Sequence, residues 1–310
     1  MKAIAYGKIL VFGGYAILEP DNIGLVVNVD KGVTAEVSEA AKTIIDTKGM
    51  DDSFVKIAVK EAYGYLKTRK IPFKNLKIKT ASDKEMFIEK KTGLGSSAAV
   101  TVAVVAAVLK FYGIDGRNKV YEIAKKAHYE AQGNKGSGYD VSAACYGSQF
   151  FLTNSREKFN WPVELISVLI YTGKPASTTE LVGNILVYKK NKPHEYKLFI
   201  EEYNNINLMC KKSFEQNNIE QIKFYLEKSW SARKLLGKLA DADIESEKMT
   251  KLIEDLKDNG AYTAGLAGAG GGDIILALCL DNKKKLIEFC KYKKMVVLDV
   301  NIVNKPYHNL

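Results

Sequence analysis

The sequence contains little arginine, and its positive charge comes almost entirely from lysine. Arginine occurs only at positions 69, 117, 156 and 233, although the 310 residues carry a net charge of +10 at neutral pH. A DNA-reading protein generally needs more arginine for bidentate contacts to base edges. The densest lysine runs, 283–285 and 293–294, are short and typical of solvated faces. We therefore expect no nucleic-acid partner, whereas the charge leaves small anionic substrates open.

Cysteines are few, and long apolar runs are missing. The cysteines form no CxxC pair, which argues against a zinc site or a disulfide framework: Cys145, Cys210, Cys279 and Cys290. The first residues run directly into a strand-like pattern and do not resemble a signal peptide. The longest apolar run, 98–109, is too short to cross a bilayer. These features predict a cytoplasmic protein without a membrane partner.

The sequence does have glycines directly before a predicted buried helix at 97–112. The segment is Gly93-Leu94-Gly95-Ser96-Ser97. Glycines let backbone N–H groups approach a phosphate, and the first turn of a helix favours an anion. The spacing matches neither a Walker loop nor a dinucleotide-binding turn. A serine that merely caps the helix is the competing interpretation, so this segment alone does not decide.

A second informative segment is a glycine-rich loop that ends at Asp140. The loop, 133–140, carries a lysine and a serine, and an apolar run follows at 141–146. Asp140 either caps that helix or orients and deprotonates an attacking hydroxyl. Lys8, on a turn between two predicted strands, is the natural partner, because a lysine would offset charge on a transferring phosphoryl group. Taken alone, Lys8 is a surface lysine.

The pattern of elements predicts an α+β protein with two domains, 1–160 and 161–310. The alternation at 25–29 and 33–37, around Asp30-Lys31-Gly32, predicts a β-hairpin. The remaining segments follow helical or alternating periods. We expect helices at 54–67, 118–132, 195–217, 219–239, 245–259 and 283–291, and strands at 3–5, 9–12, 76–80, 165–171, 274–280 and 295–301.

Three stretches together resemble the GHMP kinase superfamily, in the expected order along the chain. Residues 7–20 (GKILVFGGYAILEP) resemble its first motif, 93–99 (GLGSSAA) its second, and 268–273 (GAGGGD) its glycine-rich third. The resemblance implies a two-lobed kinase, with an N-terminal lobe like ribosomal S5 domain 2 and a ferredoxin-like C-terminal lobe. It also implies ATP and Mg²⁺ as cofactors.

Within the superfamily, the chain is similar to phosphomevalonate kinases of the eukaryotic type. The segments at 132–140 (QGNKGSGYD) and 172–179 (TGKPASTT) carry this resemblance. It implies a monomer or homodimer that transfers the ATP γ-phosphoryl to (R)-5-phosphomevalonate in the mevalonate route to isoprenoids. A mevalonate kinase, another GHMP kinase or a non-catalytic nucleotide- or sugar-binding regulator are the alternatives.

The resemblance assigns roles by position. Lys8 and Asp140 would be catalytic, and Ser97 a Mg²⁺ ligand. Lys91, Gly93, Leu94, Gly95, Ser96, Ser97 and Ala98 would hold ATP, and Tyr15, Lys135, Ser137, Ser177, Thr178, Arg233, Gly270 and Gly271 would form the acceptor site. The chain departs from many relatives at Gly14, where they have Glu. Glu130 is the candidate for a second Mg²⁺ ligand, with a solvated helix glutamate as the alternative.

Overall fold

The computed structural model describes residues 1–310 except 49, 89, 135, 154 and 175–176. Its first layer is a mixed sheet built around two long strands, β1 (Lys2–Phe12) and β2 (Gly24–Glu39), which pair antiparallel. Further strands extend this sheet: β3 (Ile44–Asp46), β4 (Leu76–Ser82), β7 (Gln149–Phe151) and β8 (Arg156–Lys158). The smaller elements η1 (Ala16–Leu18), η2 (Lys84–Met86), β5 (Phe87–Ile88) and β6 (Lys90–Lys91) lie nearby in sequence.

The predicted hairpin at 25–37 is wrong, because β2 runs straight through Asp30-Lys31-Gly32. The Asp30 N–H donates to the Asn301 carbonyl at 2.9 Å. The Gly32 N–H donates to Asp83 Oδ2 at 2.7 Å. Since distant segments satisfy these polar groups, the chain does not need to reverse here. The break expected at Gly7 is likewise absent, and β1 is continuous.

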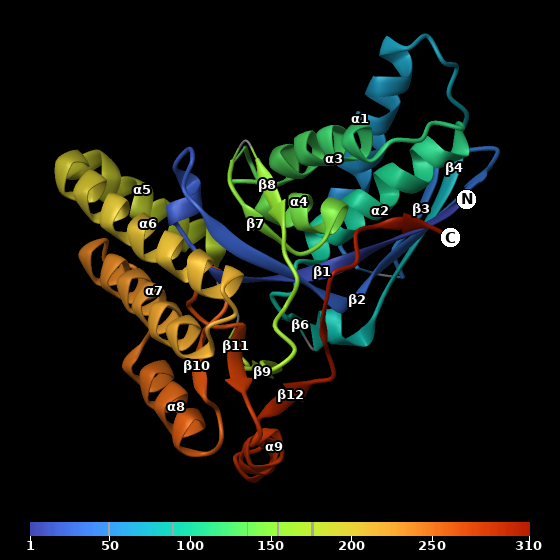
Figure 1. The fold of residues 1–310 in the computed structure, drawn as a ribbon. Helices are drawn as coiled ribbons and strands as arrows, with labels where there is room; N and C mark the ends of the chain where they lie inside the picture. Colours follow the sequence, from blue (N-terminus) through green and yellow to red (C-terminus); the bar gives the residue numbers. More distant parts are fainter. Residues whose placement is uncertain (49, 89, 135, 154, 175–176) are drawn as a thin grey trace.

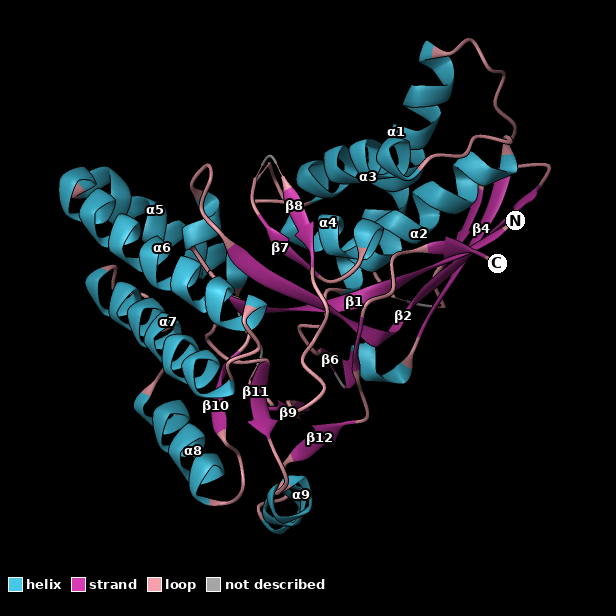
Figure 2. Cartoon of the chain, in the orientation of Figure 1, coloured by secondary structure: helices cyan, strands magenta, loops and turns pink. Residues whose placement is uncertain are grey.

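Four helices cover one face of this sheet (Figures 1 and 2): α1 (Ser53–Thr68), α2 (Ser96–Phe111), α3 (Arg117–Ala131) and α4 (Tyr139–Tyr146). All residues of α2 from 101 to 109 are buried, as its apolar sequence predicts. Helix α2 packs on β1 and β2 and against α1, α3 and α4. The segment 93–97 is therefore anchored by the centre of the core.

The second part of the chain forms a smaller antiparallel sheet with helices. Its strands pair in the order β10 (Thr263–Leu266), β11 (Ile274–Cys279), β9 (Ile166–Tyr171), β12 (Val296–Leu298). Its helices are α5 (Thr178–Asn191), α6 (Pro193–Glu215), α7 (Ile219–Leu239), α8 (Glu247–Asp258) and α9 (Lys283–Tyr292). The helices predicted here are confirmed, and α5 is an addition that the pattern did not indicate.

The last residues return to the first sheet. Strand β13 (Ile302–Val303) pairs with β2, and β14 (His308–Asn309) pairs with β1, so both termini lie side by side in Figure 1. Residues 302–309 therefore complete the sheet of the N-terminal part, and the division at residue 160 stays a prediction. Among the described residues, no helix combines the length and apolarity that a membrane span requires.

Candidate active site

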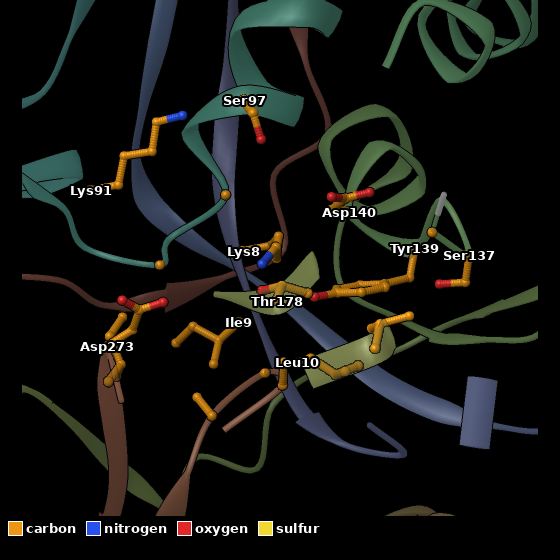
Figure 3. A pocket seen from close by; sticks show the side chains of 18 of the residues that line it. Lys8, Ile9, Leu10, Lys91, Ser97, Ser137, Tyr139, Asp140, Thr178 and Asp273 are labelled. Carbon is orange, nitrogen blue, oxygen red and sulfur yellow. The ribbon is translucent and has the colours of Figure 1, made fainter. Parts of the chain in front are cut away.

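A cavity of about 490 Å³ brings together segments from both halves of the chain. Its walls come from β1, the start of α2, the start of α4, the start of α5 and the glycine-rich segment after β10. Figure 3 shows Lys8 near its centre, with Asp140 and Asp273 on opposite sides of it. Of the predicted site residues, the cavity is lined by Lys8, Lys91, Gly93, Gly95, Ser96, Ser97, Ser137, Asp140, Thr178 and Gly270.

The start of α2 is shaped to receive an anion. Gly95 is the N-cap residue in a left-handed conformation (φ +78°), and neither serine caps the helix with its side chain. The first hydrogen bond of the helix runs from the Ala99 N–H to the Gly95 carbonyl, so the N–H groups before Ala99 have no partner within the helix. The serine-cap alternative is therefore wrong, and Ser97 keeps its hydroxyl at the cavity.

Lys8 is buried, with only 8% of its surface exposed, and acidic and hydroxyl groups surround its ammonium group. Burial lowers its pKa, but the Tyr139 hydroxyl, the Asp140 carboxylate and more distantly Asp273 outweigh burial, so the pKa of Lys8 is raised above its ordinary value. The Nζ atom also lies 5.2 Å from the centre of the Tyr139 ring. Lys8 therefore carries a fixed positive charge at neutral pH.

Asp140 lies in the first turn of α4, and its two carboxylate oxygens have different neighbours. Oδ1 accepts a hydrogen bond from the Val141 N–H at 2.9 Å. Oδ2 lies 3.7 Å from Nε2 of His128, and only 15% of the side chain is exposed. The helix-capping interpretation is wrong, because the N-cap of α4 is Gly138, which has no side chain to cap the helix. The carboxylate lines the cavity.

Several predicted acceptor residues hold the loops instead of lining the cavity. The Tyr15 hydroxyl donates to the Ala269 carbonyl at 2.6 Å, and Gly271 donates its N–H to the Ile244 carbonyl. Arg233 is buried in α7 and donates to the carbonyls of Leu266 and Gly268 at 2.6 and 2.9 Å. These residues fix the glycine-rich segment that forms one wall of the cavity.

Other predicted residues have positions that suggest a structural task. The side chains of Leu94 and Ala98 belong to the hydrophobic core, although the Leu94 carbonyl accepts from the Lys8 N–H at 2.8 Å. Ser177 is the N-cap of α5 and accepts from the Glu180 N–H. Its neighbour Thr178 lines the cavity. Lys135 lies outside the described residues.

Glu130 lies away from Ser97. Its carboxylate pairs with Lys60 at 2.5 Å, and this partner lowers the pKa of Glu130. His128, two residues earlier on α3, approaches Ser97 at 3.2 Å. Residues two apart on a helix do not share a face, so Glu130 points elsewhere. The structure therefore does not bring the two candidate Mg²⁺ ligands together and favours the solvated-glutamate alternative.

Sequence reasoning gave no role to four residues that the structure places at or beside the cavity. Gln132, Tyr139 and Asp273 line it, and His128 lies directly behind it. Asp273 had one sequence signal, because it is the acidic residue that closes the glycine-rich segment. In the structure it adopts a positive φ of 54°. No local pattern distinguishes His128 from an ordinary core histidine.

Oxygen donors suited to Mg²⁺ are present in the cavity, but they do not form a complete protein site. Among the residues that the structure describes, no three His, Cys, Asp or Glu side chains group as metal ligands. Ser97 and Asp140 line the cavity and offer a hydroxyl and a carboxylate oxygen. This donor set fits a Mg²⁺ ion that arrives with the phosphates of ATP, because such an ion takes most of its ligands from phosphate and water.

Comparison with known proteins agrees with this geometry. The model of the GHMP kinase N-terminal domain matches residues 53–148, and that of the GHMP kinase C-terminal domain matches 210–294. A phosphomevalonate kinase of Saccharolobus solfataricus is 29% identical over 90% of each chain.

Solved structures share the fold over nearly the whole chain. The Lin0012 protein of Listeria innocua superimposes with a TM-score of 0.89 at 21% identity, covering 100% of this chain and 99% of that one. A Streptococcus pneumoniae phosphomevalonate kinase, in complex with phosphomevalonate and AMPPNP, superimposes with 0.81 at 22% identity, covering 98% and 99%. The two family models together match more than half of the sequence, and the fold agrees with them over nearly the whole chain: the chain belongs to the GHMP kinases.

Proposed function

We propose that this chain is a phosphomevalonate kinase, which transfers the γ-phosphoryl group of MgATP to the phosphate of (R)-5-phosphomevalonate. One observation carries the proposal: Ser137 and Thr178, from the two loops whose sequences resemble phosphomevalonate kinases, line the same cavity as Lys8, Asp140 and the start of α2. The two acceptor loops and the phosphate loop thus meet at one place. The relative with 90% coverage of both chains carries that name.

The phosphate loop and Lys8 would supply most of the electrostatic stabilisation of the ATP phosphates and of the transferred group. N–H groups at the start of α2 would receive the ATP phosphates, and Lys91 lies at the mouth of the same cavity. The fixed charge of Lys8 would offset the negative charge that is shared between the transferred group and its donor and acceptor oxygens. Mg²⁺ would enter with ATP and be held by Ser97.

Asp140 would orient the acceptor more than deprotonate it. The attacking atom is a phosphate oxygen, which is already ionised at neutral pH and needs little help from a base. The Tyr139 hydroxyl and, after it, the Asp140 carboxylate raise the pKa of Lys8. Asp140 would thus balance part of the positive charge of this lysine.

The lining of the cavity explains how two polyanions would be accommodated. Among its described residues, two lysines (Lys8 and Lys91) are balanced by two aspartates (Asp140 and Asp273). Binding would therefore depend on hydroxyl and N–H donors and on Mg²⁺ as well as on lysine charge. Ser137, in the loop before α4, and Thr178, the first residue of α5, would supply such donors to the acceptor.

Turnover of phosphomevalonate and mevalonate, measured side by side with MgATP, tests the acceptor. We expect diphosphomevalonate and ADP from phosphomevalonate, with kcat/KM for mevalonate lower by about a hundredfold or more, because the site is built to pair with the acceptor phosphate. Faster phosphorylation of mevalonate would instead identify the chain as a mevalonate kinase.

A variant of Asp140 tests whether the chain is a catalyst or a nucleotide-binding regulator. We expect Asp140→Asn to retain nucleotide binding and to lower kcat by about 10²-fold, the scale for a reacting group that is no longer held in the productive position. Retained binding together with an unchanged transfer rate would remove Asp140 from the mechanism.

A further inference from the structure

His128 connects two residues of the proposed site that come from different helices. It lies in the last turn of α3 and is 1% exposed. Its Nε2 atom lies 3.2 Å from Oγ of Ser97, on α2, and 3.7 Å from Oδ2 of Asp140, on α4. His128 is not among the residues that line the cavity, so its effect on substrates would be indirect.

We propose that His128 is a positioning residue, which holds the Ser97 hydroxyl and the Asp140 carboxylate in the arrangement that MgATP requires. The inference rests on the phosphoryl transfer proposed above. It adds a specific task for a buried side chain to which the sequence motifs assign none. The ligand that this arrangement would serve is the triphosphate of MgATP, because the Ser97 hydroxyl would offer Mg²⁺ an oxygen.

The hydrogen-bond inventory supports one arrangement of the imidazole. A carboxylate oxygen accepts hydrogen bonds, so its position beside Nε2 favours the tautomer that carries the hydrogen on this nitrogen. Nε2–H then lies between Asp140 Oδ2 and Ser97 Oγ, and Ser97 retains its own hydrogen and a free lone pair. Oδ1 of Asp140 accepts from the Val141 N–H, and the imidazole lies 3.7 Å from the second oxygen of the same carboxylate, so His128 limits the space into which that oxygen can turn.

The ring itself is held by an aromatic contact. The rings of Phe54 and His128 are 5.4 Å apart between centroids and tilted by 38°. Nζ of Lys91, the cavity lysine next to the phosphate loop, lies 5.5 Å from the centroid of the same Phe54 ring. Phe54 at the start of α1 therefore supports both the histidine and the lysine, which limits how far the imidazole can move away from Ser97.

Direct binding of AMPPNP, measured by calorimetry with Mg²⁺ and with EDTA, tests the proposal without any acceptor. His128→Phe removes the donor but keeps an aromatic ring beside Phe54, whereas His128→Gln places an amide nitrogen near the position of Nε2. We expect His128→Phe to weaken Mg²⁺–AMPPNP binding about 10- to 100-fold, as loss of a partner behind a metal ligand usually does. Binding in EDTA should change much less, and His128→Gln should restore most of the loss.

The matched control is His194→Phe, the same substitution at an exposed histidine of α6. Its Mg²⁺–AMPPNP affinity should equal that of the parent protein, and thermal unfolding of every variant reports whether it folds. If His128→Phe does not fold, His128→Asn replaces it, because the shorter amide cannot reach the position of Nε2. Affinity of His128→Phe or His128→Asn equal to the parent value, or a loss in His128→Gln as large as theirs, would overturn the proposal. Failure of phosphomevalonate turnover would leave this binding result standing and would count against the proposed acceptor only.

Discussion

At Gly95 the backbone occupies space that a side chain would need. Its φ is +78°, and a Cβ there would lie 2.7 Å from Cε of Lys8. The glycine that caps α2 thus also permits the close approach of Lys8 to the start of this helix. A methyl group at this position would overlap the Lys8 side chain and push it out of its place.

We therefore expect Gly95→Ala to lower kcat/KM by about 10²-fold, the scale of a misplaced catalytic group, while it destabilises the fold by only about 1 kcal/mol. The control is Gly113→Ala, which has a similar φ of +70° but meets nothing within 4 Å. It should show the same loss of stability in urea unfolding with unchanged kcat/KM. Equal activity in both variants would refute the steric coupling between Gly95 and Lys8.

The sequence allowed prediction of residues that act through local pattern. Gly93 to Ser97 and Asp140 carry glycine turns and helix starts beside them, and these signals depend only on near neighbours. His128 could not be found in this way, because its partners Ser97 and Asp140 come from two other helices. The family resemblance placed Arg233 at the acceptor, whereas its partners in the structure, two backbone carbonyls, have no signature in a sequence.

Among the elements, α7 secures the glycine-rich wall of the cavity. Arg233 ties this helix to the carbonyls of Leu266 and Gly268, and its Nε has no hydrogen-bond partner among the described residues. A Cβ at Gly14 would lie 3.3 Å from Cδ of Arg233 and 2.9 Å from the Gly268 carbonyl. The glycine at position 14, where many relatives have Glu, thus lies directly against this contact.

We expect Arg233→Met to destabilise the protein by about 3 kcal/mol, because it leaves two buried carbonyl groups without donors. The midpoint of urea unfolding measures this loss, and the exposed Arg69→Met serves as control. The KM values for the substrates should also rise, because the glycine-rich wall of the cavity would be less ordered. This effect does not require Arg233 to contact the acceptor. A variant as stable as Arg69→Met would show that α7 does not secure the wall.

The helices and strands that could be predicted are those whose apolar residues recur at a regular spacing without interruption. Helices at 219–239 and 283–292 agree with their apolar spacing. The error at 30–32 arose because Asp, Lys and Gly favour a turn locally, whereas Asn301 and Asp83 supply the partners that keep β2 extended. Neither partner is near in sequence, so no local rule would have included them.

For the whole molecule, every cysteine is buried, which predicts how the thiols respond to pH. All four are free and buried: Cys145, Cys210, Cys279 and Cys290. Burial raises the pKa of Cys279 and Cys290 to about 11. The thiolate is the reactive form, so at about pH 8 the native protein should react with Ellman's reagent far more slowly than the urea-unfolded chain.

The raised pKa of these thiols also makes the stability of the fold depend on pH. A buried thiol whose pKa is raised stabilises the fold fully below its unfolded pKa, and that contribution falls as pH rises from about 9 toward 11. Urea midpoints should therefore decline over this range, and thiol labelling should accelerate with the decline. Rapid labelling of a thiol at neutral pH without unfolding would contradict the buried positions.

The return of residues 302–309 to the first sheet has a consequence for biosynthesis. The Tyr307 N–H donates to the Ala144 carbonyl in α4, and Ser148 just after that helix donates its hydroxyl to the Val303 carbonyl. A ribosome makes β1 and β2 long before the segment that braces the helix of Asp140. A nascent chain can thus bury much of this sheet early, while Asp140 gains its final support only after translation has passed residue 307.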